Sequence, residues 1–263
     1  MITRLRNFLA FKRHYEKNLP LDRRHSDLFL LSFPSTGVTW LSHIIANINV
    51  IKSGLDHSVT FYNYKQFVPD IHYSRDISDL LTSYPGFRII KSHSTFNPYY
   101  KNNVYLIRNP NEVLRSYYRL DQHYGNYKYS YVDFVKDKQF GIDAWVRHVQ
   151  SWLGQKYCQV HLLTYEGLCT DINVELLNLF NNIGMNVDEE ILNTAIELSN
   201  IENMRKSEQD YYNNSPGYKY EFVASKYNNQ DIDLEAAQII SEATLGVYEE
   251  ILHVKYNADF TLK

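Results

Sequence analysis

Four short runs of consecutive apolar residues stand out along the chain. They occupy residues 28–33, 87–90, 104–107 and 160–165, with the sequences LFLLSF, FRII, VYLI and VHLLTY. Their apolar character is continuous rather than alternating, which is typical of strands covered on both faces, as in a parallel sheet. The pattern therefore predicts four buried strands.

Helical periodicity fills most of the sequence between and after these runs. The predicted helices cover residues 39–48, 111–120, 141–154, 173–184, 189–199 and 234–252. Strands that alternate with helices indicate a doubly wound α/β fold with a mainly parallel sheet flanked by helices. The 263 residues contain no repeat or Gly/Ser linker and are 44% hydrophobic, which suffices for one large core. We therefore expect a single domain over residues 1–263.

Polar residues follow every predicted strand at its carboxyl end. They are the segment 35–39 after the first strand, Lys91 and His93 after the second, Arg108 after the third, and Tyr165 at the end of the fourth. In an open parallel sheet, ligands bind at the carboxyl edge of the strands. Four separate segments are thus predicted to meet at one crevice.

The charge and cysteine content narrow the choice of ligands and location. Lys and Arg number 27 against 30 Asp and Glu, a net charge of -3, which excludes the global basic field of non-specific nucleic-acid binding. Anionic ligands must therefore be met locally. Cys158 and Cys169 fit neither a zinc site nor a disulfide framework, so we expect no metal and a reducing, cytoplasmic location. No apolar run is long enough to span a bilayer.

The first 26 residues form a basic segment that is predicted to be helical. Leu5, Phe8, Leu9 and Phe11 alternate there with basic residues. A solvated helix packed on the domain is the main interpretation, and contact of residues 1–25 with a membrane surface is the alternative. The basic residues are Arg4, Arg6, Lys12, Arg13, Lys17, Arg23 and Arg24.

The stretch FPSTGVTW, at residues 33–40, joins the first strand to the first predicted helix. Such a turn presents backbone N–H groups to an anion, Gly37 permits close approach, and the helix N-terminus adds partial positive charge. Thr36 and Thr39 add hydroxyl donors. The stretch lacks the first glycine and the lysine of nucleoside-triphosphatase loops, which disfavours a magnesium-dependent NTPase. The alternative is an ordinary strand–turn–helix capped by Thr39.

The stretch YLIRNPNEVLRSYYR, at residues 105–119, supplies a second group suited to a phosphate. Arg108 leaves a strand, Pro110 opens a helix, and Ser116 follows Arg108 by eight residues, two turns into that helix. A guanidinium group offers a fixed fork of donors, and a hydroxyl completes the cradle.

These motifs resemble those of the sulfotransferases that use 3′-phosphoadenosine 5′-phosphosulfate (PAPS). PSTGVTW is similar to the family's phosphosulfate loop P-K-S-G-T-T-W, and RNPNEVLRSYY is similar to its 3′-phosphate motif R-N-P-x-D/E-x-x-x-S-x-Y-Y. KSH at 91–93 resembles the family's K-T-H, and Tyr165-Glu166 resembles a later Tyr-Glu that contacts adenine. The order of the motifs along the chain also agrees.

The resemblance implies a P-loop-like sulfotransferase architecture and transfer of a sulfuryl group, in line, from PAPS to a hydroxyl or amine. The acceptor would be a small molecule or a carbohydrate. It implies His93 as the base and Lys91 as the cation that stabilises the leaving phosphate. Trp40 would stack on adenine or pack its helix against the sheet, and both readings stay open. The implied donor-binding residues are Ser35, Thr36, Gly37, Val38, Thr39, Trp40, Arg108, Ser116 and Tyr165.

The aromatic residues divide into two groups. Trp145 and Trp152 lie seven residues apart on one helix face and are predicted to be core. The tyrosines and His123 of residues 117–131 are predicted to line an acceptor pocket or a lid over it, because amphipathic rings suit sugars and aromatic alcohols.

Two departures from the family pattern keep other functions open. Ser35 stands where the family has a lysine, and SPGYKYEFVASKYNN, at residues 215–229, has no R-K-G segment, so Lys219 or Lys226 would have to hold the 3′-phosphate. A nucleotide or small-molecule kinase of related fold is one alternative, although its loop lysine and magnesium-holding acids are not evident. A catalytically silent binding protein is the other, and Ser35 is its best support.

Overall fold

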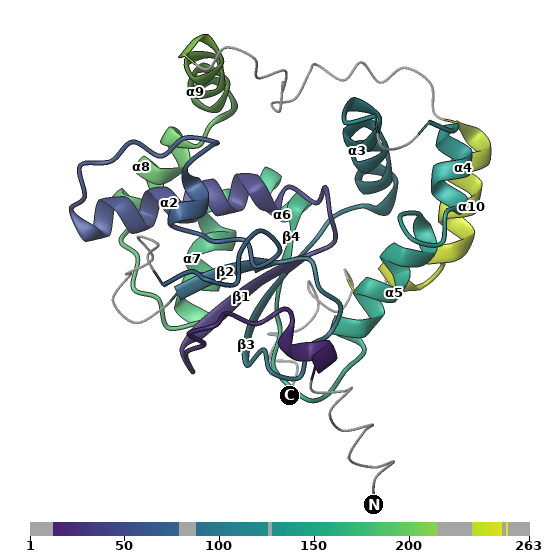
Figure 1. The fold of residues 1–263 in the computed structure, drawn as a ribbon, viewed down its shortest axis with the longest axis horizontal. Helices are drawn as coiled ribbons and strands as arrows, with labels where there is room; N and C mark the ends of the chain where they lie inside the picture. The colour runs from purple at the N-terminus through teal and green to yellow at the C-terminus, as the bar shows by residue number, and fades with distance from the viewer. Residues whose placement is uncertain (1–12, 79–87, 126–127, 215–232, 249–250, 252–263) are drawn as a thin grey trace, which may run out of the picture.

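Four parallel strands form the centre of the protein (Figure 1). The computed structural model describes residues 13–78, 88–125, 128–214, 233–248 and 251. The strands are β1 (Asp27–Ser32), β2 (Arg88–Ser92), β3 (Asn102–Ile107) and β4 (His161–Thr164), and their order in the sheet is β2-β1-β3-β4. The four predicted strands and the parallel sheet are confirmed.

Alternate residues of the strands face two separate hydrophobic cores. Leu28 and Leu30 of β1 pack into one core, and Phe29 and Leu31 pack into the other. The first core is closed by α2 (Val38–Ser53), η1 (Tyr64–Gln66), α6 (Tyr165–Thr170), α7 (Ile172–Asn182) and α8 (Glu189–Leu198). The second is closed by α3 (Pro110–His123), α4 (Tyr131–Lys136), α5 (Ile142–Leu153) and α10 (Leu234–Thr244). The sheet is therefore covered by helices on both faces, as the continuous apolar runs predicted (Figure 1).

The strand register brings the carboxyl ends of the sheet to one edge. Leu31 of β1 pairs with Ser92 at the end of β2, and Ser32 pairs with Leu106 near the end of β3. Ile107 in turn pairs with Thr164, the last residue of β4. The segments that follow the four strands therefore begin side by side, which is the arrangement that a strand-edge crevice requires.

Several helices differ in extent from the sequence-based prediction. α2 runs five residues past the predicted end, to Ser53, and the C-cap Gly54 adopts a left-handed backbone that closes the helix. α10 ends at Thr244, because Leu245 leaves the helical conformation and Gly246 has φ 77°, and helical backbone is found again at residues 247–248 and 251 of the predicted helix. Residues 249–250 and 252 of that prediction lie outside the described residues.

Three helices of the described residues were not predicted, and two of them depend on a local cap. α4 is short and begins at a capping box between Ser130 and Asp133. α6 begins at Tyr165, which the prediction placed in the last strand, because the Thr164 side chain caps the helix at Gly167. α9 (Ile201–Asn214) directly follows α8 after a two-residue break.

The N-terminal segment is helical only in part. Residues 13–16 are helical, and residues 17–26 form turns rather than the predicted helix over 1–26. Pro20 explains the end of the helix, because proline disfavours helical backbone in the residue before it and cannot donate the next hydrogen bond. Residues 1–12 lie outside the described part of the chain.

A buried ion cluster fixes the amino end of the sheet. The Arg88 side chain is 1% exposed, and its Nε donates to Asp27 Oδ1 at 2.8 Å. Its Nη2 donates to Asp27 Oδ2 at 2.9 Å, and its Nη1 donates to Asp22 Oδ2 at 2.7 Å. Both carboxylates are thereby engaged, and the N-terminal turns are tied to the start of β1 and β2.

Candidate functional site

The turn between β1 and α2 has a backbone that few residues tolerate. Ser35 has φ 66° and Gly37, the N-cap of α2, has φ 91°, both in the left-handed region. A Cβ at Gly37 would lie 2.6 Å from two ring carbons of Tyr165. Glycine is therefore required at 37 for the backbone angle and for close approach of the ring. A turn of this kind presents backbone N–H groups ahead of a helix N-terminus, which suits an anion.

The two threonines of the turn have different environments. Thr36 is 1% exposed, and its Oγ1 has no hydrogen-bond partner among the described residues. A buried hydroxyl without a partner is costly, and a bound ligand is one way to satisfy it. Thr39 instead hydrogen bonds to the hydroxyl of Tyr64. It does not cap α2, so the capped strand–turn–helix alternative is wrong in that respect.

Val38, the first residue of α2, has its side chain in the hydrophobic core, at 3% exposure. Only its backbone N–H remains to serve a ligand. Ser116 lies half-buried on α3, on the helix that follows Arg108. Lys219 and Lys226 lie outside the described residues.

Tyr165 connects the turn to the arginine that leaves β3. The Arg108 Cζ lies 4.2 Å from the centroid of the Tyr165 ring, which is a cation–π contact. The same ring also lies against Gly37, through the close approach described above. Arg108 is 19% exposed and has Glu112 Oε2 at 3.7 Å, a loose pair that leaves most of its donors available. The predicted meeting of segment 35–39, Arg108 and Tyr165 is thus observed.

His93 is held in one tautomer at the end of β2. Its Nδ1 lies 2.8 Å from the carbonyl oxygen of Ser32. Because a carbonyl only accepts, Nδ1 carries the proton and donates it, which leaves Nε2 with a free lone pair. Burial lowers the pKa of His93 to about 3, and the charge of Lys91 adds to the effect. His93 is therefore neutral at physiological pH.

Two further histidines fix the backbone around His93. The His93 backbone N–H donates to His72 Nε2 at 2.9 Å, and the two rings stack with centroids 6.0 Å apart. His148 Nε2 donates to the His93 carbonyl at 3.2 Å, and its Nδ1 accepts from the Tyr105 hydroxyl at 2.7 Å. Burial lowers the pKa of His148 to about 4, so this histidine is a neutral structural support. Neither residue could be identified from the sequence, because neither lies in a motif or directly after a predicted strand.

Lys91 is paired, which the sequence did not indicate. Its Nζ lies 3.2 Å from Asp70 Oδ2, and the two side chains are 8% and 2% exposed. Asp70 also pairs with Lys91 through an isolated parallel bridge, and its Oδ1 accepts the His72 backbone N–H at 3.0 Å. The positive charge of the Lys91 ammonium group is therefore balanced by the Asp70 carboxylate.

Trp40 packs its helix and also borders the turn. Its Nε1 donates to the Ser199 carbonyl at 3.1 Å, and its ring meets the Tyr165 ring edge-on at 6.0 Å. Ser199 Oγ binds His43 Nδ1 at 2.8 Å and accepts from Asn47 Nδ2 at 3.0 Å. This buried polar cluster fixes the junction of α8 and α9 beside the turn. No periodicity or motif marked Ser199, which is 159 residues from Trp40.

Other sequence-based expectations concern the core, metals and membranes. Trp145 and Trp152 are fully buried, as predicted, and Trp152 Nε1 donates to the Ser94 carbonyl at 2.8 Å. Within the described residues, no group of three or more His, Cys, Asp or Glu side chains is placed to hold a metal ion. A search of the same part of the chain finds no helix long and apolar enough to cross a membrane.

Comparison with known proteins gives a consistent result. The family model described as a sulfotransferase domain matches residues 25–235. Sulfotransferase 1E1 of Bos taurus is 27% identical over 264 residues, covering 92% of this chain and 83% of that protein. The amine sulfotransferase of Oryctolagus cuniculus is 24% identical, over 76% of this chain and 69% of that protein. The crystal structure of mouse sulfotransferase SULT7A1 complexed with PAP superposes with a TM-score of 0.58 at 19% identity. The superposition covers 89% of this chain and 90% of that one.

The contact between Gly37 and Tyr165 predicts an unequal cost for two glycine substitutions. Gly54→Ala should cost about 1–2 kcal/mol of unfolding free energy, because only its left-handed backbone is strained and no atom lies within 4 Å of the new Cβ. Gly37→Ala should cost at least about 1 kcal/mol more, because the Tyr165 ring must also move. Chemical denaturation of both variants measures the difference. Equal losses of unfolding free energy in the two variants would show that the Tyr165 ring does not restrict the side chain at position 37.

Proposed function

The chain belongs to the sulfotransferase family and is a sulfotransferase, and from this premise we propose that it moves a sulfuryl group in line from PAPS to a hydroxyl or amine. The observation that carries the proposal is the junction of three segments through one ring. Tyr165 lies against Gly37 of the β1–α2 turn and also contacts Arg108. An anion-binding turn and a guanidinium group are thereby held together, as a donor with two separate phosphate groups requires.

The residues present suit such a donor. The backbone N–H groups of residues 35–39 and the unpartnered Thr36 hydroxyl are assigned to the 5′-phosphosulfate. Arg108 and Ser116 are assigned to the 3′-phosphate, and the rings of Trp40 and Tyr165 to the adenine. The complex of mouse sulfotransferase SULT7A1 with PAP, the desulfonated nucleotide, supports this choice of donor. The related kinase alternative is not kept, because the matching family is that of sulfotransferases.

His93 is assigned as the base. The donor supplies the sulfuryl group, and His93 Nε2 takes the proton of the attacking hydroxyl or amine. The bond from Nδ1–H to the Ser32 carbonyl keeps the imidazole in the tautomer that can accept this proton. The pKa of about 3 makes the ligand-free imidazole a weak base, and negative charge brought into the crevice raises this pKa towards neutrality.

Lys91 is assigned to the developing negative charge on the leaving phosphate. An ammonium group has three donor positions, and Asp70 occupies one of them. Asp70 therefore holds Lys91 at the end of β2 while two protons remain for a ligand. Lys91 would supply the positive charge that Ser35 lacks, and the Asp70 carboxylate would partly offset that charge. A catalytically silent, nucleotide-binding protein is the second candidate, since Ser35 and the neutralised Lys91 both favour it.

The proposal also covers the acceptor substrate and the cellular location of the protein. Small-molecule hydroxyl compounds, amines and carbohydrates are the proposed acceptors, and the amine sulfotransferase named above supports the amine class. Tyr117, Tyr118 and Tyr131 contact the core beside α3 and α4, so the predicted acceptor role is assigned to the exposed Tyr124, Tyr129 and His123. A cytoplasmic location is proposed from the two free cysteines.

Binding of PAP tests the donor assignment directly. Isothermal titration should detect PAP binding to the parent, and Arg108→Ala and Ser116→Ala should each weaken it by about 10- to 150-fold, the loss of one charge-assisted hydrogen bond. Arg147→Ala, an exposed arginine on α5, is the matched control and should bind PAP as the parent does. A parent that does not bind PAP would refute the donor. Unchanged affinity in both site variants would refute the 3′-phosphate assignment.

The role of Lys91 is best tested in a variant in which Asp70 no longer carries a charge. Lys91→Gln alone would strand the buried Asp70 carboxylate, and any loss of activity would be confounded by instability. Asp70→Asn should retain or increase single-turnover transfer from PAPS. Asp70→Asn/Lys91→Gln should then transfer about 100-fold more slowly than Asp70→Asn, because one preorganised donor is gone.

Equal rates in Asp70→Asn and the double variant would show that Lys91 does not act on the leaving group. If the parent binds PAP but no variant turns over with pooled phenols, amines and glycans, the silent-binding candidate is correct.

A further inference from the structure

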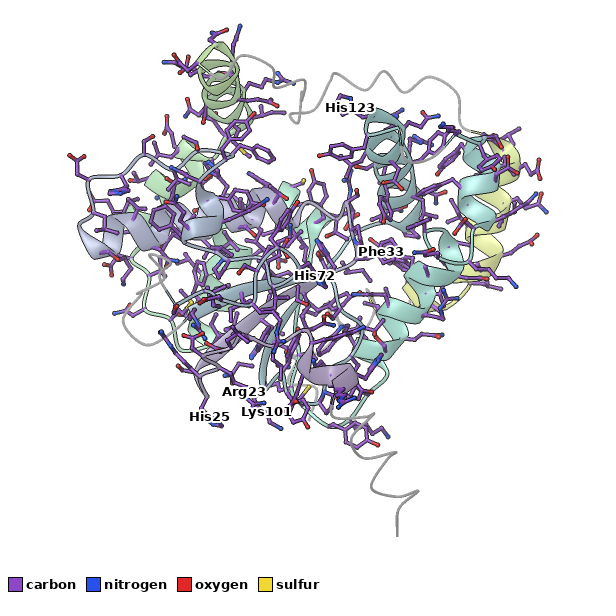
Figure 2. The ribbon with its side chains drawn as sticks, viewed as in Figure 1. Arg23, His25, Phe33, His72, Lys101 and His123 are labelled. Carbon is purple, nitrogen blue, oxygen red and sulfur yellow. The ribbon has the colours of Figure 1, made fainter. Side chains whose placement is uncertain are left out.

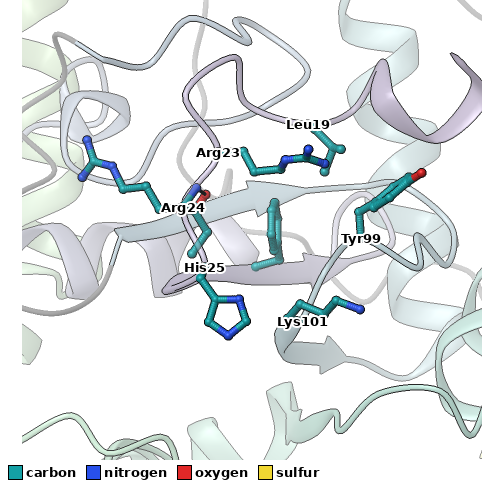
Figure 3. Close-up of a pocket in the computed structure, with 8 residues that line it drawn as sticks. Leu19, Arg23, Arg24, His25, Tyr99 and Lys101 are labelled. Carbon is teal, nitrogen blue, oxygen red and sulfur yellow. Dashed lines mark hydrogen bonds between the residues drawn. The ribbon is translucent and has the colours of Figure 1, made fainter. Parts of the chain in front are cut away.

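A basic surface lies at the amino edge of the sheet, away from the candidate site. Arg23, Arg24 and His25 precede β1, and Lys101 precedes β3; together with Tyr99 they line one pocket (Figure 3). We call these five residues the amino-edge surface. In Figure 2, Arg23, His25 and Lys101 lie together at the lower edge, and His123 of α3 lies at the opposite end of the molecule. The residues assigned to the donor all follow the carboxyl ends of the strands.

The positive charges of Arg23 and Lys101 have no carboxylate partner in the described part of the chain. The nearby carboxylates of Asp22 and Asp27 are both bound by the buried Arg88 guanidinium, at 2.7 and 2.8 Å. Arg24 shares Asp22 only at 3.4 Å. Within the described residues, no carboxylate lies within 4 Å of Arg23 or of Lys101. An excess of cations is therefore displayed by a chain whose net charge is -3.

The contacts of these cations leave their charges exposed to a partner. The Arg23 guanidinium lies 5.6 Å from the centre of the Tyr99 ring, and Lys101 Nζ donates to the Pro98 carbonyl at 3.2 Å. Neither contact neutralises charge. Arg23 and Lys101 are both exposed, so an anionic partner could contact them without disturbing the packing of the protein.

Exposed apolar side chains flank the same edge. Leu21 is 66% exposed in the turns that carry Arg23, and Tyr157 is 85% exposed beside Lys156. Tyr157 reaches this edge because the next residue, Cys158, contacts Asn103 at the start of β3, at 3.3 Å. A basic surface edged with leucine and tyrosine is suited to the interface of a bilayer, where cations meet headgroups and apolar tips enter the acyl boundary.

The first described residues of the chain lie at this edge, and the sequence before them is also basic and apolar. Tyr15 accepts a hydrogen bond from Asn97 at 3.0 Å, and Asn18 accepts one from Tyr100 at 2.6 Å, which places the entry of the chain beside Tyr99 and Lys101. Residues 1–12 add three basic residues interleaved with leucine and phenylalanine. A free phosphate would use a single cage of donors, whereas the cations of the described residues 23–25 and 101 are spread over two segments of the chain.

We propose that the amino-edge surface docks the protein on an anionic lipid bilayer. The carboxyl edge of the sheet then faces away from the membrane, and the candidate site stays open to its ligands. The proposal does not rest on the sulfotransferase mechanism, and it concerns residues that take no part in that site.

Vesicle co-sedimentation of the full chain tests the proposal. The parent should bind phosphatidylcholine vesicles that contain phosphatidylserine, should not bind pure phosphatidylcholine, and should lose binding as salt rises above about 0.1 M and shortens the Debye length. Each basic residue near an anionic surface contributes about fivefold in affinity, so Arg23→Gln/Arg24→Gln/Lys101→Gln should bind about 100-fold more weakly.

The matched control is Lys138→Gln/Arg147→Gln/Lys206→Gln, which removes the same charge from exposed positions elsewhere. It should bind vesicles as the parent does, and both triple variants should retain the parent's PAP affinity. Absence of parent binding to the anionic vesicles, or equal losses in the two triple variants, would overturn the proposal. Binding of inorganic phosphate at this surface without vesicle binding would overturn it in favour of a soluble anion.

Discussion

The hydrogen bond from His93 Nδ1 to the Ser32 carbonyl is the contact on which the candidate site depends. It joins the residue after β2 to the last residue of β1, at 2.8 Å, just before the chain turns towards Gly37. One bond thus sets the tautomer of the proposed base and its place beside the β1–α2 turn. The parallel register makes this possible, because it aligns the ends of β1 and β2 before any side chain is considered.

The titratable groups of the candidate site carry little net charge of their own. Burial keeps His93 and His148 neutral, with pKa values lowered to about 3 and 4, and Asp70 offsets the charge of Lys91. Arg108 is the charged group least committed to a partner, since Glu112 lies 3.7 Å away and is half-exposed. Under the proposed function, local donors rather than a global field attract the donor nucleotide, in keeping with the net charge of the chain. The basic amino edge is a separate feature at the other end of the strands.

The sheet and the crevice could be predicted from the sequence because their signals are local. Continuous apolar runs mark the strands, and Gly37, His93 and Arg108 follow them directly. Short helices such as α4 and α6 depend on single caps, Ser130 and Thr164, which periodicity does not detect.

The contacts that support the site could not be predicted in the same way. Asp70 and His72 come from an irregular segment without any period, so nothing in the sequence pointed to their pairing with Lys91 and His93. Ser199 meets Trp40 across 159 residues, and only the folded chain shows that contact. The role of Trp40 remained open in the sequence for this reason.

The most direct test of the account is the rate of transfer from radiolabelled PAPS in His93→Asn, measured beside PAP affinity. An asparagine side-chain amide can still donate to the Ser32 carbonyl, while the acceptor nitrogen Nε2 is lost. The account predicts PAP affinity and folding stability close to those of the parent, with transfer at least about 100-fold slower. Transfer at the parental rate, or a parallel loss of nucleotide binding and stability, would contradict the assignment of His93 as the base.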